Sequence, residues 1–239
     1  MEKLIKSKDR VNSHGEVFTP SSIVKKMLNI PEIKNAIYSI NKTVLEPSAG
    51  EGAFLTEVLH RKLKTADRLS KNIDEYNHFA LIALTSVFGI ELQEDNMEML
   101  VMNIYATFIE EYLHALKKYH SDRNNNVISS AKYIIQTNMM QGDFLTQRDS
   151  DDNPIIVTEW KTTRKKGKCT VKRIQHLLSE IINDEQAPLA QEVEYFDMFT
   201  GDAYSAGNQN IFHLYEYPDM EICKLYQPVE PLNIRAVLY

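Results

Sequence analysis

Cysteine is scarce in this sequence, and no apolar run is long enough to cross a membrane. Two cysteines, Cys169 and Cys223, cannot form a disulfide framework, and no Cys/His spacing suits zinc, so we expect no metal site. The longest apolar stretch, residues 79–90, contains polar residues and is too short to span a bilayer, and residues 1–10 are charged. These features predict a cytoplasmic protein that does not enter a membrane.

An excess of positive charge is also missing. The 239 residues carry 27 Lys and Arg against 33 Asp and Glu, which gives a net charge of -6. Because a dedicated nucleic-acid module is usually basic, any contact with DNA must come from a local patch or from a partner chain. The hydrophobic fraction of 43% predicts a globular chain, with one large domain or one domain and an appendage.

Residues 42–55, Lys-Thr-Val-Leu-Glu-Pro-Ser-Ala-Gly-Glu-Gly-Ala-Phe-Leu, read as a strand, a tight turn and a helix start. Gly50 and Gly52 let the backbone approach a ligand closely at the helix N-terminus. No Gly-Lys-Ser/Thr follows, and Leu55 stands where a dinucleotide fingerprint has its last glycine. Glu46 would repel a pyrophosphate but suits a cationic ligand. The turn therefore predicts a nucleotide-like ligand with a positive charge, such as S-adenosylmethionine.

This stretch resembles the first motif of the amino-methylating DNA methyltransferases, usually Asp-Pro-x-x-Gly-x-Gly-x-Phe-Leu. Three further segments resemble other motifs of that family in the family's own order, and they are Phe-Thr-Pro at 18–20, Gly-Ile-Glu at 89–91 and Gly-Asp-Phe-Leu at 142–145. Together the four motifs cover residues 15–145. The resemblance implies an S-adenosylmethionine-dependent N6-adenine DNA methyltransferase of the restriction-modification kind.

The resemblance also implies roles for single residues. In the family, the Phe-Thr-Pro segment lines the pocket around the methionine part of the cofactor, the acidic residue after the second strand accepts from the ribose hydroxyls, and the third motif contacts the adenine. The cofactor-binding residues implied in this way are Phe18, Thr19, Pro20, Glu46, Pro47, Gly50, Gly52, Phe54, Glu91, Asp143 and Phe144. From the residues alone, Thr19 and Pro20 also fit a helix start with Thr19 as its cap, and Asp143 and Phe144 also fit a turn and a core position.

The family's fourth motif, Asn/Asp-Pro-Pro-Tyr/Phe, is missing. In the family its oxygens accept the protons of the target amine, and its aromatic ring stacks on the flipped base. None of the eight prolines is followed by proline or by an aromatic residue. The nearest segment is Asp152-Asn153-Pro154-Ile155, which makes Asn153 and Pro154 the candidates for catalytic residues, although the polar stretch around them also fits a turn.

Three functions stay open on these residues. The first is a DNA adenine methyltransferase, or a degenerate relative that keeps the cofactor half and has lost or altered the acceptor half. The second is a catalytically silent, cofactor-binding subunit that works with a partner methyltransferase, specificity subunit or restriction subunit. The third is a methyltransferase that acts on a protein or a small molecule, for which the fourth motif is not required.

A short basic run follows the fourth-motif region. Its positive side chains could contact phosphates, and its tryptophan could stack on a base. The nucleic-acid residues expected on this basis are Trp160, Lys161, Arg164, Lys165, Lys166 and Lys168. A solvated hairpin loop is the alternative interpretation of the same run.

The expected fold is α/β, a Rossmann-like methyltransferase sheet with helices on both faces and β-hairpins at the C-terminus. We expect an N-terminal helical segment at 1–40, a cofactor-binding core at 41–160, and a basic loop, a helix and hairpins of the same domain at 161–239. Apolar spacing predicts the elements by the following ranges: strands at 43–46 and 87–91, helices at 53–63, 94–118 and 128–136, an insertion at 65–77 and an amphipathic helix at 170–183.

Overall fold

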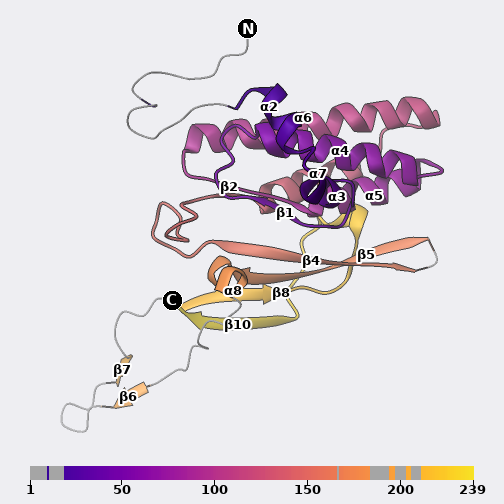
Figure 1. Ribbon diagram of the computed structural model, residues 1–239. Coiled ribbons are helices and arrows are strands. Elements are labelled where there is room, and N and C mark those ends of the chain that lie inside the picture. Colours follow the sequence, from indigo (N-terminus) through magenta and orange to yellow (C-terminus); the bar gives the residue numbers. More distant parts are fainter. Residues whose placement is uncertain (1–9, 11–18, 166, 184–193, 197–202, 206–210) are drawn as a thin grey trace.

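The computed structural model describes residues 10, 19–165, 167–183, 194–196, 203–205 and 211–239. Its centre is a parallel sheet in which the strands lie in the order β1-β2-β3, and Figure 1 labels the first two of them. The three strands are β1 (Val44–Glu46), β2 (Val87–Glu91) and β3 (Met139–Gln141). Both pairings are parallel, with Val44 opposite Val87 and Gly89 opposite Met139. The predicted parallel sheet is therefore confirmed.

Helices connect the parallel strands, because a chain must cross over before it can form the next strand in the same direction. α4 and α5 lead from β1 to β2, and α6 and α7 lead from β2 to β3. Their bounds are Ala53–Leu69, Ile73–Thr85, Glu94–Tyr119 and Asn125–Asn138. The polar run at 65–77, expected as an insertion, is mostly helical. This polar run continues α4, where Thr65 and Ala66 are buried, and then begins α5 behind the cap Asn72, whose side chain accepts from the Glu75 N–H.

The core lies on both faces of the parallel sheet, because successive side chains of a strand point to opposite faces. Val87 of β2 belongs to the cluster that includes the fully buried Leu100 and Phe108 of α6. Phe88 and Ile90 belong to a second cluster with Val157 of β4 and Leu178 of α8. The helices α4 to α7 thus cover one face, and an antiparallel sheet with α8 covers the other. The expectation of a helical layer on both faces is wrong to that extent.

Two short helices precede the sheet, α2 (Ser21–Met27) and α3 (Pro31–Ile37). Pro20 is the N-cap of α2 with extended backbone, φ -56° and ψ 143°, and no side chain caps this helix among the described contacts. The interpretation of Thr19 as cap and Pro20 as first helical residue is therefore shifted by one position. Val24 is buried, which fixes α2 against the rest of the molecule.

A second sheet is antiparallel and has the order β10-β8-β5-β4, with β9 also paired to β5. The bounds are β4 (Ile156–Lys165), β5 (Lys168–Leu177), β8 (Ile211–Glu216), β9 (Met220–Glu221) and β10 (Asn233–Leu238). Three smaller elements complete the described chain, α8 (Leu178–Asn183), the 3₁₀ turn η1 (Ile222–Lys224) and a hairpin of β6 (Glu194–Phe196) with β7 (Ala203–Ser205). Paired strands in this part of the chain were predicted and are confirmed.

The amphipathic helix expected at 170–183 is wrong over most of its length. Residues up to Leu177 belong to β5, and only α8 is helical. Ten residues of β5 pair in register with β4, and along β5 the buried Cys169, Val171 and Arg173 alternate with more exposed neighbours. The apolar positions of this stretch fit both helical spacing and the alternation of a strand, and pairing with β4 selects the strand.

Candidate cofactor-binding site

The carboxyl ends of the three parallel strands bring the sequence motifs together. Ligands of open α/β sheets bind at this edge, in the crevice beyond the strand ends. The glycine turn follows β1, Glu91 ends β2, and Gly142 and Asp143 follow β3. Since adjacent strands lie about 4.8 Å apart, three motifs that are far apart in the sequence form a row of roughly 10 Å.

The glycine turn has two left-handed residues, Gly50 with φ 55° and Gly52 with φ 90°. A Cβ placed on Gly52 would lie 2.6 Å from Leu100 Cδ1, so this glycine allows α4 to pack closely against α6. A Cβ on Gly50 would meet no described atom within 4 Å, because that position faces an open cavity. Gly52 therefore serves the fold, and Gly50 lies at the cavity side of the turn.

A cavity of about 750 Å³ opens beside this turn, a size that suits a small-molecule ligand. Five residues expected at the cofactor line it, and they are Thr19, Pro20, Glu46, Gly50 and Phe54. Four carboxylates stand in its wall against one lysine, and these charged residues are Glu46, Glu51, Glu57, Glu110 and Lys25. Such a wall favours a ligand that carries positive charge over a phosphate.

Glu46 lies where β1 enters this cavity, and it is half-buried. Burial raises the pKa of its carboxyl, and a hydrogen bond from the Ser48 N–H lowers the pKa by a smaller amount. A partly desolvated carboxylate interacts strongly with a cation, because less water screens the pair. The position and the environment of Glu46 both fit the contact with a cationic group.

Glu91 is 6% exposed, and protein groups already occupy its carboxylate. Oε2 accepts from the Gly50 N–H at 2.7 Å, and Oε1 accepts from the Gln93 N–H at 3.0 Å and from Asn96 Nδ2 at 3.3 Å. A carboxylate has about four acceptor sites, which leaves room for one further donor such as a ribose hydroxyl. In the structure Glu91 holds the glycine turn against the end of β2.

A smaller cavity of about 200 Å³ lies at the end of β3, and Gly142, Asp143 and Arg148 are among its lining residues. Asp143 Oδ1 accepts from the Leu145 N–H at 2.8 Å, so this aspartate also makes the expected turn. Phe144 packs against the cluster that contains Phe88 and Ile90. The large cavity, Glu91 and the small cavity thus follow the strand order β1, β2, β3.

The remaining expected residues are placed less directly. Pro47 is exposed in the turn, and Phe18 lies outside the described residues. Asn153 and Pro154 lie in a polar turn beside the small cavity. Asp149 Oδ1 accepts from the Asn153 N–H at 2.9 Å, the Asn153 amide donates to Asp149 Oδ2 at 3.3 Å, and Pro154 is buried and bridges to Arg148. The hydrogen bonds of Asn153 are thus directed into its own turn.

The expected nucleic-acid residues divide between the two faces of the β4–β5 hairpin. The indole N–H of Trp160 donates to Asn138 Oδ1 at 2.8 Å, and its ring meets Tyr133 edge-on. The guanidinium of Arg164 lies 4.2 Å from the ring centre of Phe79. Both side chains therefore contact the helical layer. Lys161, Lys165 and Lys168 are exposed and Lys166 lies outside the described residues.

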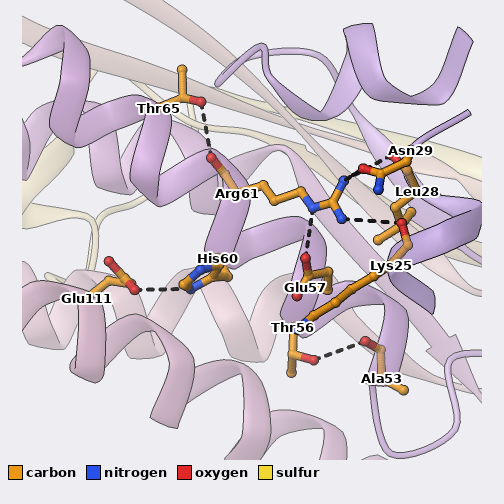
Figure 2. Close-up of polar contacts among 10 residues, drawn as sticks. All are labelled: Lys25, Leu28, Asn29, Ala53, Thr56, Glu57, His60, Arg61, Thr65 and Glu111. Carbon is orange, nitrogen blue, oxygen red and sulfur yellow. Dashed lines mark hydrogen bonds and ion pairs between the residues drawn. The ribbon is translucent and has the colours of Figure 1, made fainter. Parts of the chain in front are cut away.

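Arg61 is a positioning residue that the sequence did not indicate (Figure 2). Arg61 is 9% exposed, and its guanidinium donates to Glu57 Oε1 at 2.8 Å, to the Leu28 carbonyl at 3.0 Å and to Asn29 Oδ1 at 2.9 Å. It ties the end of α2 to α4, which holds Thr19 and Pro20 beside the glycine turn. The sequence shows only an arginine within an apolar helix pattern, and it does not indicate which residues at the end of α2 this arginine will contact.

Two further contacts support the same turn. Asn103 of α6 lines the large cavity, and its Nδ2 donates to the Glu51 carbonyl at 2.8 Å. Glu111 of α6 is 5% exposed and lies 3.0 Å from His60 Nδ1 and 3.0 Å from Lys64 Nζ, both on α4 (Figure 2 shows the His60 contact). α6 therefore fixes the loop between the two glycines and the helix that follows it.

Comparisons with known proteins add one positive result. A search of curated proteins and a search of solved structures each returned no match. Within the part of the chain that the structure describes, no helix has the length and apolar character to cross a membrane, and no group of three or more His, Cys, Asp or Glu is arranged to hold a metal ion. A family model described as N-6 DNA methylase matches residues 2–188, which is more than half of the sequence. The chain therefore belongs to the N-6 DNA methylase family, as its four motifs predicted.

Proposed function

We propose that this protein binds S-adenosylmethionine at the edge formed by β1, β2 and β3 and acts as a DNA adenine-N6 methyltransferase of the restriction-modification kind, or as a degenerate relative of one. The observation that carries the proposal is the row of Gly50, Glu91 and Asp143 at adjacent strand ends, inside the region that matches the family. Gly50 lines the large cavity and Asp143 lines the small one. S-adenosylmethionine supplies the methyl group when it is bound.

The residues of the site fit that cofactor in three ways. The acidic wall around Glu46 suits the positive sulfonium and ammonium groups. Gly50 leaves its side of the turn open, so a ligand can lie against the backbone. Glu91 keeps one acceptor site, and Asp143 lines the small cavity with a carboxylate of which one oxygen bonds to Leu145. We assign the methionine part to the large cavity and the adenine to the small one.

A second candidate function is a cofactor-binding subunit without catalysis of its own, which works with a partner methyltransferase, specificity or restriction subunit. Two observations favour it. The amide of Asn153 is bonded to Asp149 within a polar turn, and β1 forms one edge of the described parallel sheet instead of pairing with a further strand that could present acceptors. Acceptance of the target amine's protons then falls to another chain.

The test combines binding and transfer on the same preparation. We would titrate the full chain with S-adenosylmethionine in a calorimeter and then measure transfer of labelled methyl groups to mixed genomic DNA. Binding with transfer supports the enzyme, whereas binding without transfer supports the accessory subunit. Absence of binding would overturn the proposal for both.

Variants make the test specific to the site. Gly50→Val should weaken binding strongly, because its side chain would fill the ligand side of the turn, and Glu46→Gln should weaken it by removing a negative charge from the cavity wall. Gly167→Val is the matched control, since Gly167 also has a left-handed φ, 78°, but lies in the β4–β5 turn. Circular dichroism would show that each variant is folded. Equal losses for Gly50→Val and Gly167→Val would contradict the assignment.

A further inference from the structure

The hairpin of β4 and β5 has two chemically different faces, which the register defines. On the inner face Trp160, Thr162 and Arg164 stand opposite Arg173, Val171 and Cys169. On the outer face Lys161 stands opposite Lys172, Thr163 opposite Thr170, and Lys165 opposite Lys168. Two pairs of lysines therefore face each other directly across the strands, with a pair of threonines between them.

Directly opposed like charges destabilise a sheet, so this arrangement needs an explanation other than folding. Near the base of the hairpin the charge is balanced, because Lys161 pairs with Glu159 at 3.3 Å and Lys172 pairs with Glu216. Glu221, opposite Thr170, pairs with Lys224 at 2.8 Å. At the tip, Lys165 and Lys168 are exposed, and no carboxylate of a described residue pairs with them. The excess positive charge is thus concentrated at the tip.

The inner face holds this tip in place. The guanidinium of Arg164 lies over the Phe79 ring of α5, and Cys169 and Val171 are fully buried in the main core. Because the inner face of the hairpin packs against α5 and the main core, the outer lysines project from a fixed surface. With a rise of about 3.3 Å per residue, Lys161 and Lys165 are roughly 13 Å apart along β4.

The tip lies far from the cofactor edge. β4 begins after the loop that contains Asp143 and runs to Lys165, a distance of roughly 30 Å at 3.3 Å per residue. In Figure 1 the hairpin projects toward the end of the molecule that is opposite this loop. These lysines are therefore not placed to touch a base at the cofactor, and they suit a contact with another part of a long ligand.

We propose that the outer face of the β4–β5 hairpin, formed by Lys161, Lys165, Lys168, Lys172, Thr163 and Thr170, binds the phosphate backbone of duplex DNA without regard to sequence. This inference rests on the proposed function, in which DNA is the substrate. Lysines act as point charges for phosphates, and threonine hydroxyls donate to phosphate oxygens. A chain with a net charge of -6 repels DNA as a whole, so a local basic face is what permits contact.

The experiment measures fluorescence anisotropy of a labelled duplex of mixed sequence with the full chain, at salt concentrations from about 50 to 200 mM. We expect binding that is independent of S-adenosylmethionine. Lys165→Gln/Lys168→Gln should reduce the magnitude of the slope of log K against log salt by about 2, since each lysine that contacts a phosphate contributes about one. At the lowest salt, the Kd of this double variant for the duplex should be about tenfold higher than that of the original chain, or more.

The matched control is Lys71→Gln/Lys117→Gln, which removes the same charge from exposed positions in the helical layer. The proposal is overturned if the control lowers affinity as much as the tip variant, if the tip variant binds like the original chain, or if polyglutamate displaces the chain as well as unlabelled duplex does. Calorimetry with S-adenosylmethionine separates the two proposals. A chain that binds the cofactor but never binds DNA overturns this inference alone, and a chain that does not bind the cofactor overturns the proposed function.

Discussion

The carboxylate of Glu91 joins the glycine turn to the end of β2 and the start of α6. Its hydrogen bond from the Gly50 N–H links the ends of β1 and β2, and its bonds from Gln93 and Asn96 fix the start of α6. Buried carboxylates are stable when such donors surround them. Under the proposed function, a ribose hydroxyl at Glu91 would meet a side chain whose orientation is already set, which would reduce the entropy lost on binding.

Gly52 should tolerate replacement less well than a glycine with a similar backbone conformation elsewhere. Gly52→Ala adds left-handed strain and a Cβ 2.6 Å from Leu100, so we expect the free energy of unfolding to fall by about 2–4 kcal/mol. Gly167→Ala has the strain without the contact and should cost about 1 kcal/mol. Urea unfolding of both variants measures the difference. Equal costs would mean that packing against Leu100 contributes nothing.

Glu46 should make cofactor binding depend on pH. Because burial raises its pKa, the carboxyl begins to take up a proton above the ordinary carboxyl value of 4.5. As pH falls through that range, the negative charge disappears and affinity for a cationic ligand decreases. The folded state, by contrast, becomes more stable, since a raised folded-state pKa means that the carboxylate destabilises the fold at higher pH.

Calorimetric titrations with S-adenosylmethionine between neutral and acidic pH would measure this dependence. Glu46→Gln should bind more weakly at neutral pH and should lose the part of the pH dependence that comes from this residue. A variant that keeps the full dependence would show that another group is responsible.

At the scale of elements, Arg61 joins the short helix α2 to the long helix α4. α2 has seven residues, and a helix of that length is not stable by itself. We expect Arg61→Met to lower the free energy of unfolding by about 1–3 kcal/mol, because the Leu28 carbonyl and Glu57 lose a buried partner. It should also weaken cofactor binding, since Thr19 and Pro20 line the cavity at the start of α2.

Arg68→Met is the control for that prediction. Arg68 lies on the same helix, bonds to Thr65 and stacks on Tyr38, and neither of these described contacts involves α2. Urea unfolding and calorimetry on both variants would separate general stability from the placement of α2. If both variants bind the cofactor equally well, Arg61 has no special role in the site.

Elements with strong local patterns were predicted well. The strand at 87–91 and the helix from Glu94 match β2 and α6. The apolar positions of each element fit only one of the two spacings, that of a strand or that of a helix, and the residues at the ends of each element mark its boundaries. The start of α4 behind Gly52 was also correct. β5 was missed because Val171, Ile174 and Leu177 satisfy helical spacing, while the partner strand β4 lies before a turn and supplies the hydrogen bonds that select a strand.

At the scale of the whole molecule, the reactivity of the two cysteines can show whether the helical layer and the second sheet stay in contact. Cys169 of β5 and Cys223 of η1 are both buried in the main core, which also contains α5 and α7. Burial raises the pKa of Cys169 to about 11 and that of Cys223 to about 12. At pH 8 both thiols are therefore protonated as well as shielded, and thiolate is the reactive form.

We expect neither thiol to react with an aromatic disulfide reagent at pH 8 until the helical layer and the second sheet separate. In increasing urea, the rate of thiol modification should rise together with the loss of helical circular dichroism, as in one cooperative unit. Rapid modification of one thiol without loss of helix would show that the second sheet opens by itself.

The sequence by itself determined the family, the glycine turn and most of the parallel core, since these depend on motifs and on periodicity within short segments. Tertiary structure decided three other matters. It placed Arg61 and Asn103 in support of the turn, it directed Glu91 to Gly50, and it set Lys161, Lys165, Lys168 and Lys172 on one face of a hairpin while turning Trp160 and Arg164 to the other. The reason is that hydrogen-bond partners and strand register join residues that are distant in the chain, and a local pattern carries no record of which distant segment will supply the partner.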